Sequence, residues 1–205
     1  SLTNPAPTFG SRLSQVTQSE GNKYIPKVVW ECVEHIRAHG MKTEGVFRKA
    51  GLKERVTEMV NKFDSEIPVV LCPKNDIHNA AACLKQWLRE LPEPLVPFQH
   101  YKAFLYAQSV EEYKTLVGKI PKQNQQLMAY LCTFLERLSE NEDVTRMHTK
   151  NLALVFAPNI LRPMKEDAME AFQNSDKKID SFSRIIENVY PIFGIKPPAD
   201  KIAYV

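Results

Sequence analysis

The sequence predicts an all-α protein folded as a single-domain helical bundle, and three observations support this. Apolar residues recur every three to four positions through most of the chain, the spacing of one helical face. No run shows the alternation of apolar and polar residues that is typical of a half-buried strand. The length of 205 residues fits one large domain, and a hydrophobic content of 43% can form a sizeable core.

Helices are expected to fill most of the chain after a polar lead-in over residues 1–23, which reads as extended. The segments with an apolar helical stripe are 27–39, 51–64, 76–91, 98–108, 110–119, 122–138, 147–162 and 179–190. Pro26 suits a first helical turn, Pro92 ends the third helix, and Pro158 is expected to break the helix over 147–162. Residues 163–178 are charged and poorly periodic, and we interpret them as a loop.

Composition and charge exclude several classes of protein. The net charge of +3 is too small for a typical nucleic-acid-binding domain. No apolar run is long enough to cross a bilayer, and no signal segment opens the chain. The four cysteines form no C-x-x-C pair and read as reduced thiols, which favours a cytoplasmic location. Because the chain starts at Ser1, we expect a fragment of a longer protein, whose other regions could recruit it to membranes.

The sequence shows no active site of its own. It lacks the phosphate loop G-x-x-x-x-G-K-[ST], the nucleophile elbow G-x-S-x-G and the dinucleotide motif G-x-G-x-x-G. His35 and His39 have the i, i+4 spacing of a metal-binding pair, but Ile36 stands where a zincin carries its glutamate. No third ligand is evident, so we expect neither a metal nor a cofactor and interpret the pair as solvated or hydrogen-bonded.

One candidate site is Arg48, in the glycine-bounded segment 41–51 (MKTEGVFRKAG). The glycines allow tight turns. Val46 and Phe47 are expected to pack onto the core, so that the loop would present the long cation of Arg48 at a fixed position. The alternative is an ordinary solvated arginine.

Two further features are candidates for a binding surface. Lys85 and Arg89 lie at i and i+4, hence on one helical face, which suits an acidic partner although like charges at this spacing are mildly destabilising. Asn151 and Asn159 are embedded in apolar sequence, where an amide must be hydrogen-bonded. Each asparagine therefore either caps a helix end or faces a partner, with Asn151 as a candidate supporting residue.

Four blocks at these residues resemble the Rho GTPase-activating protein (RhoGAP) domain family. They occur in that family's order and spacing, and they are FG (9–10), TEGVFRKAG (43–51), DIH with LKQWLRELPEPL (76–78 and 84–95) and NLALVFAPNILRP (151–163). The resemblance spans residues 9–194, with 1–8 as a lead-in and 195–205 as a C-terminal tail.

The resemblance implies a bundle of about nine helices that activates a Rho-family small GTPase in its GTP-bound state. It maps the family's arginine finger onto Arg48 and the basic residues that bind the GTPase onto Lys85 and Arg89. It maps the asparagine that places the finger and contacts the GTPase onto Asn159. GTP and Mg²⁺ would belong to the partner, so the chain would be a GTPase activator rather than an enzyme with its own catalytic site.

The chain departs from the family pattern at two points. Ala157 stands in FAPN where many members carry glycine, and KAG replaces the commoner SG-type ending of the finger loop. Ala157 and Ala50 are both small, so we expect activity to be retained. The alternative function is a non-catalytic module of the same fold that binds a GTPase as a scaffold.

Overall fold

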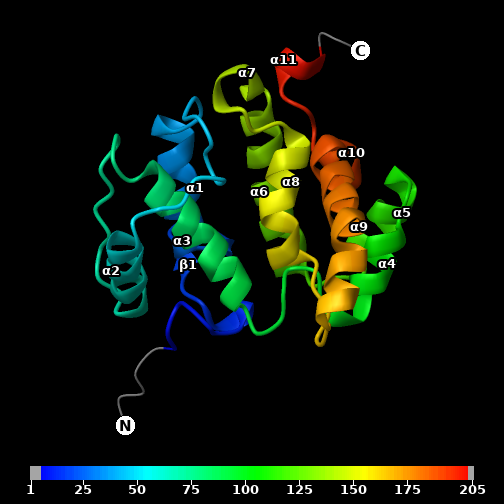
Figure 1. The fold of residues 1–205 in the computed structure, drawn as a ribbon, viewed down its shortest axis with the longest axis horizontal. Helices are drawn as coiled ribbons and strands as arrows, with labels where there is room; N and C mark the ends of the chain where they lie inside the picture. The colour runs from blue at the N-terminus through cyan, green and yellow to red at the C-terminus, as the bar shows by residue number, and fades with distance from the viewer. Residues whose placement is uncertain (1–5, 203–205) are drawn as a thin grey trace.

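The computed structural model describes residues 6–202 and confirms the all-α prediction (Figure 1). Over this range it contains eleven α-helices rather than about nine, because several of them are only one or two turns long. The helices are α1 (Lys27–His39), α2 (Lys53–Asp64), α3 (Ile77–Glu90), α4 (Tyr101–Tyr106), α5 (Val110–Val117), α6 (Lys122–Ser139), α7 (Glu142–Thr145), α8 (Thr149–Ile160), α9 (Ala168–Glu187), α10 (Val189–Phe193) and α11 (Ala199–Ile202).

Helices α6 and α8 occupy the middle of the molecule in Figure 1, with α1, α2 and α3 on one side and α4, α5, α9 and α10 on the other. Helix α6 packs against α1, α8, α9 and α10, and α8 packs against α3 and α9. The apolar stripes of these helices meet in one continuous core. Within residues 6–202, no helix is long and apolar enough to cross a membrane.

The lead-in is more structured than the extended segment expected for residues 1–23, of which 1–5 lie outside the described residues. Strands β1 (Gln18–Ser19) and β2 (Asn22–Pro26) form a small antiparallel hairpin whose turn includes Gly21, at a positive φ of 78°. A short 3₁₀ helix precedes it, and the apolar side chains Phe9, Leu13 and Val16 are buried. The strands are too short for an alternating pattern to be read from the sequence.

The expected break at Pro158 is wrong, because α8 continues through this residue to Ile160. A proline removes one backbone donor, which here would have bonded the carbonyl of Leu154. Leu154 lies on the exposed face of α8, so water can reach that carbonyl instead. The missing bond is confined to the last turn of α8, and the helix tolerates it.

The loop expected over 163–178 is also wrong, because α9 begins at Ala168 and runs to Glu187. A capping box starts the helix: Asp167 accepts from the backbone N–H of Glu170, whose side chain accepts from the backbone N–H of Asp167. The first turns of α9 are mostly exposed and therefore carry no apolar stripe. Instead of one last helix over 179–190, the chain forms the second half of α9 and then α10.

Three of the four cysteines, Cys32, Cys83 and Cys132, are buried thiols, and Cys72 is exposed. Beyond residue 194, the short helix α11 is tied to α6 by two hydrogen bonds of 2.7 and 2.8 Å from Arg137 to the carboxylate of Asp200. The boundaries of the domain at 9 and 194 stay predictions.

Candidate functional site

Arg48 lies in the loop between α1 and α2, and its side chain is exposed. The two residues before it, Val46 and Phe47, are completely buried, as the sequence predicts. The Phe47 ring packs edge-on against the rings of Phe156 on α8, at a centroid distance of 4.8 Å, and Phe134 on α6, at 6.0 Å. The loop is therefore anchored between the two central helices directly beside Arg48.

The backbone at this anchor is tightly turned. Gly45 and Phe47 both have a φ of 69°, in the left-handed region that disfavours a bulky residue such as phenylalanine. The packing of the Phe47 ring between two other aromatic rings holds this conformation and offsets the free energy that the backbone strain costs. The N–H groups of Arg48 and Lys49 donate to the carbonyl of Gly45 at 2.9 and 2.8 Å, which closes the turn with Arg48 at its tip.

The part of the loop before Arg48 is held by Thr145, the last residue of α7, and by the turn that follows it. The N–H of Gly45 donates to the carbonyl of Thr145 at 2.7 Å, and Thr145 is completely buried. The amide of Asn151 donates to the carbonyl of Arg146 at 3.0 Å, and Arg146 adopts a positive φ of 58°. Asn151 thus braces the turn that presents the Thr145 carbonyl to the loop.

The side of the loop that follows Arg48 is held by α3. The N–H of Leu52, the first residue before α2, donates to Oδ1 of Asn79 at 2.7 Å. The amide of Asn79 donates in turn to Asp76 at 2.9 Å, and both residues are buried. Asp76 also accepts two hydrogen bonds from Arg55 of α2, at 3.0 and 2.9 Å, and these hold the pKa of its carboxyl well below its usual range.

Asn79 is not among the site residues that the sequence predicts. The available signal was a polar residue beside the apolar stripe of α3, but a buried asparagine gives no indication of its partner in the sequence.

The two basic residues of α3 differ in their surroundings. Lys85 is half-buried, and its ammonium donates to the backbone carbonyl of Phe47, next to Arg48. Burial, and to a lesser extent the charge of Arg89, lowers the pKa of Lys85. Arg89 lies one turn further along α3 and is exposed. The structure therefore brings Lys85 to the loop and leaves Arg89 on the surface.

Asn159 lies in the last turn of α8, is half-buried and caps no helix N-terminus. Its amide nitrogen donates to the carbonyl of Val155 at 3.2 Å, four residues earlier in the same helix. That carbonyl is also the normal acceptor of the backbone N–H of Asn159 in an α-helix. The side-chain bond is therefore a second bond to an acceptor that is already used, and within residues 6–202 no hydrogen bond to Oδ1 of Asn159 is found.

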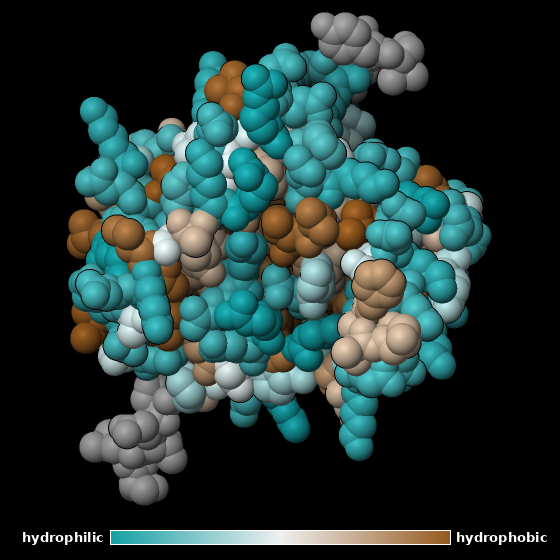
Figure 2. Space-filling view, in the orientation of Figure 1, coloured by the Kyte–Doolittle hydropathy of each residue, from teal (hydrophilic) through white to brown (hydrophobic). Residues whose placement is uncertain are grey.

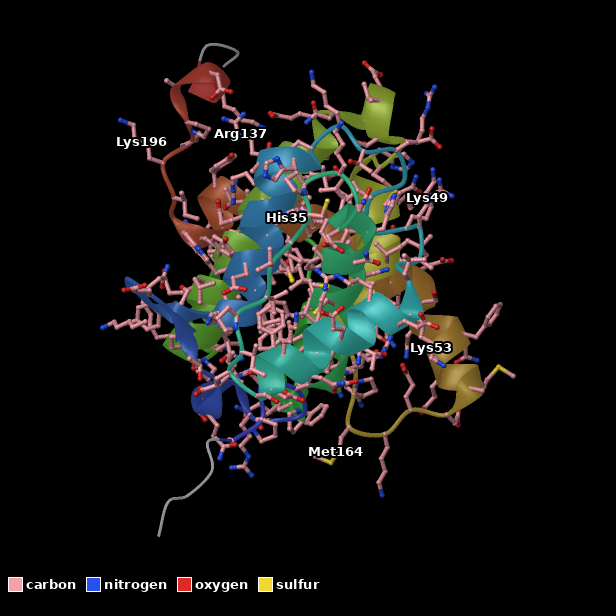
Figure 3. All side chains as sticks on the ribbon, turned by 90° about the vertical axis from the view of Figure 1, so that its left-hand side faces the viewer. His35, Lys49, Lys53, Arg137, Met164 and Lys196 are labelled. Atoms are coloured by element: carbon pink, nitrogen blue, oxygen red, sulfur yellow. The ribbon has the colours of Figure 1, made fainter. Side chains whose placement is uncertain are left out.

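The loop lies at one edge of the molecule. Figure 3 shows Lys49, directly after Arg48, and Lys53, at the start of α2, along the same edge, whereas Arg137 and Lys196 lie at the other side of the view. Figure 2 shows that the face of the molecule seen in Figure 1 is mostly hydrophilic, with separate apolar areas.

The pair of histidines does not form part of this arrangement. The rings of His35 and His39 lie on α1 with centroids 5.2 Å apart, and burial lowers the pKa of His35. Among the residues that the structure describes, no group of three or more His, Cys, Asp or Glu side chains could hold a metal ion.

Comparison with known proteins identifies similar chains. The family model of the RhoGAP domain matches residues 26–165. Rho GTPase-activating protein 22 of Mus musculus is 35% identical in an alignment over 179 residues that covers 82% of this chain and 26% of the relative. Rho GTPase-activating protein gacY of Dictyostelium discoideum is 32% identical in an alignment over 196 residues that covers 91% of this chain and 27% of the relative. The chain thus spans about a quarter of the length of these curated relatives.

Solved structures agree with this relationship. The human Rho GTPase activating protein 15 superimposes with a TM-score of 0.84 at 26% identity, covering 93% of this chain and 94% of that chain. The BH domain from GRAF, the GTPase regulator associated with focal adhesion kinase, gives a TM-score of 0.73 at 27% identity, covering 83% and 95%. The family match extends over more than half of the chain, and it includes the Arg48 loop, α3 and α8. The chain belongs to the RhoGAP domain family.

Proposed function

We propose that this domain stimulates GTP hydrolysis by a Rho-family small GTPase in its GTP-bound state, by inserting Arg48 in trans as an arginine finger. The observation that carries the proposal is the contrast between the exposed Arg48 and the completely buried Phe47 that precedes it. The backbone of such a loop is fixed before the partner arrives, so only the side chain of Arg48 has to be ordered when it enters a partner's active site.

The expected chemistry is electrostatic. Negative charge is spread over the phosphoryl oxygens in the transition state of GTP hydrolysis, and an arginine supplied in trans stabilises it by about 10³–10⁵-fold in rate. This corresponds to roughly 4–7 kcal/mol of the barrier. The planar guanidinium of arginine can bond two oxygens at once, which the ammonium of lysine cannot do in the same geometry. GTP, Mg²⁺ and the attacking water would all be held by the GTPase.

The other candidate residues take supporting parts in this proposal. Arg89, exposed at the end of α3, would contact an acidic surface of the GTPase. Lys85 would hold the carbonyl of Phe47 and offer its remaining N–H groups to the partner, since an ammonium has three donors. Asn159 would bond the GTPase or steady the inserted loop, and Asn151 would brace the loop from behind. The proposed partner and the reduced cysteines imply a cytoplasmic site of action.

The alternative is a module of the same fold that binds a GTPase without stimulating hydrolysis. The presence of Arg48 on an anchored, exposed loop favours the catalytic role over this one.

The direct test measures hydrolysis of GTP preloaded on a panel of Rho-class GTPases, with and without the domain. We expect acceleration of at least about 10³-fold for one or more members. Binding of a GTP-loaded GTPase without any acceleration would instead support the scaffold.

A further inference from the structure

The segment that follows Arg48 has little freedom before it reaches α3. Only Lys49, Ala50 and Gly51 separate Arg48 from Leu52, whose N–H is bonded to Asn79. Helix α2 has no side-chain cap of its own at this end, so the side chain of Asn79 supplies from α3 an acceptor at its N-terminus. One buried amide therefore fixes both the start of α2 and the end of the loop.

Asn79 is itself held firmly. Its amide nitrogen donates to Asp76 at 2.9 Å and to the carbonyl of Asn75 at 3.2 Å, which leaves its Oδ1 directed at Leu52. Asp76 is fixed by Arg55 and by the N–H of Cys72, which donates at 2.7 Å. Since the hydrogen-bonding groups of Asn79 are used, its side chain cannot rotate without leaving buried polar atoms unpaired.

The loop also approaches α3 too closely for any side chain at Gly51. A Cβ atom built there would lie 2.9 Å from Oδ1 of Asn79 and 3.0 Å from the carbonyl oxygen of His78. The loop therefore contacts the start of α3 through the backbone of Gly51, and this contact fixes the distance between the loop and the helix.

We propose that Asn79 is a positioning residue for Arg48: it holds the outgoing end of the loop so that the guanidinium is presented in the orientation needed for GTP hydrolysis. This inference rests on the proposed function of Arg48. Asn79 is buried, so it acts through the loop and not by contact with the GTPase. Loss of Asn79 should then slow the chemical step and leave docking intact, since a misplacement of about 1 Å can cost about 10²-fold in rate.

The test uses the GTPase that the wild-type domain activates best, preloaded with GTP, in single-turnover hydrolysis at increasing domain concentration. The rate at saturation and the half-saturating concentration are measured for Asn79→Ala and, as a second variant that leaves the core intact, Gly51→Ala. Both should lower the saturated rate by at least about tenfold and change half-saturation by less than about twofold.

Ser181→Ala is the matched control. Ser181 is a buried, hydrogen-bonded residue of α9 that donates to the carbonyl of Phe104, remote from the loop, so its loss destabilises the fold without moving Arg48. Melting curves confirm that each variant is folded at the assay temperature.

An unchanged saturated rate in folded Gly51→Ala or Asn79→Ala would overturn the inference, and so would a loss confined to half-saturation. Wild-type stimulation by Arg48→Ala would refute the arginine-finger proposal itself. The inference about Asn79, which rests on that proposal, would then be refuted as well.

Discussion

Lys85 of α3 donates a hydrogen bond from its ammonium to the backbone carbonyl of Phe47, the residue directly before Arg48. In the sequence, Lys85 and Arg89 are two basic residues spaced four apart on one helix, but the fold gives them different surroundings. Lys85 is half-buried against the loop, whereas Arg89 is exposed at the end of α3. We therefore propose that Lys85 acts on the position of Arg48 and that Arg89 meets a partner.

Lys85→Met is expected to lower the rate of stimulated GTP hydrolysis, measured at a saturating concentration of the domain, by about tenfold or more. The substitution nearly keeps the length of the side chain but removes a charged hydrogen bond worth about 1.5–3 kcal/mol. The half-saturating concentration should change less than the rate. Lys49→Met is the control, since Lys49 lies in the same loop and pairs only loosely with Glu44, at 3.3 Å on the surface. A loss of affinity with an unchanged saturated rate would show instead that Lys85 serves chiefly to bind the GTPase.

Arg48→Ala is expected to abolish stimulated hydrolysis and to leave binding of the GTP-loaded GTPase largely intact. An arginine finger acts mainly on the transition state, so the rate falls far more than the affinity. Single-turnover hydrolysis measures the rate, and binding to a GTPase loaded with a non-hydrolysable GTP analogue measures the affinity. Wild-type stimulation by Arg48→Ala would refute the assignment.

Arg89→Ala is expected to weaken GTPase binding by about fivefold, the effect of about 1 kcal/mol for an exposed charge pair. The affinity of the wild-type domain should fall as salt rises, because charges on the surface are screened over about 8 Å near physiological ionic strength. The affinity of the variant should fall less steeply. Lys102→Ala, an exposed residue of α4 on the other side of the molecule, is the control. Equal salt dependence in all three proteins would place the docking surface elsewhere.

The helices with a buried face were predictable from the sequence, because burial imposes the 3.6-residue spacing of apolar side chains. The first half of α9 was not, since it is largely solvated and even its apolar residues Met169 and Phe172 are exposed. Its start is set by the capping box at Asp167, a signal of two residues that is easily missed among other charges. The continuation of α8 past Pro158 depends on tertiary packing, which overrides local propensity.

At the candidate site, the anchored loop was predictable because Val46 and Phe47 are adjacent apolar residues between two glycines. The contacts that hold this loop were not. Lys85 reaches Phe47 across 38 positions of sequence and Asn79 reaches Leu52 across 27, and no local pattern specifies which backbone group a buried polar side chain meets. The sequence shows which residues are polar, but their hydrogen-bond partners are known only from the folded structure.

Asp76→Asn is expected to destabilise the domain by about 1.5–3 kcal/mol at pH 7, because it weakens charged hydrogen bonds to Arg55. The pKa of Asp76 is lower in the folded state than the value of about 3.9 expected in the unfolded chain. Its stabilising contribution is therefore complete above the unfolded pKa and is lost as the pH falls towards the folded pKa.

The difference in free energy of unfolding between wild type and Asp76→Asn should consequently shrink below about pH 4. Urea unfolding at pH 7, 5 and 3.5 measures it. Asp176→Asn, which alters an exposed residue of α9, should change stability little at any of these values. A difference that stays constant down to pH 3.5 would contradict the role of the Asp76 carboxylate.

Asn159→Ala separates a contact with the GTPase from a purely structural role. The side chain of Asn159 caps no helix N-terminus and shares an acceptor, the carbonyl of Val155, that α8 already uses. Loss of a helix cap typically lowers the free energy of unfolding by about 1 kcal/mol. Removal of the Asn159 side chain should therefore lower it by less than this, and the melting temperature should change little. If Asn159 bonds the GTPase or steadies the inserted loop, stimulated hydrolysis should fall by at least about tenfold, equivalent to about 1.4 kcal/mol. Melting curves and hydrolysis assays on one preparation decide between the two, and a clear drop in melting temperature with full activity would assign Asn159 to the fold alone.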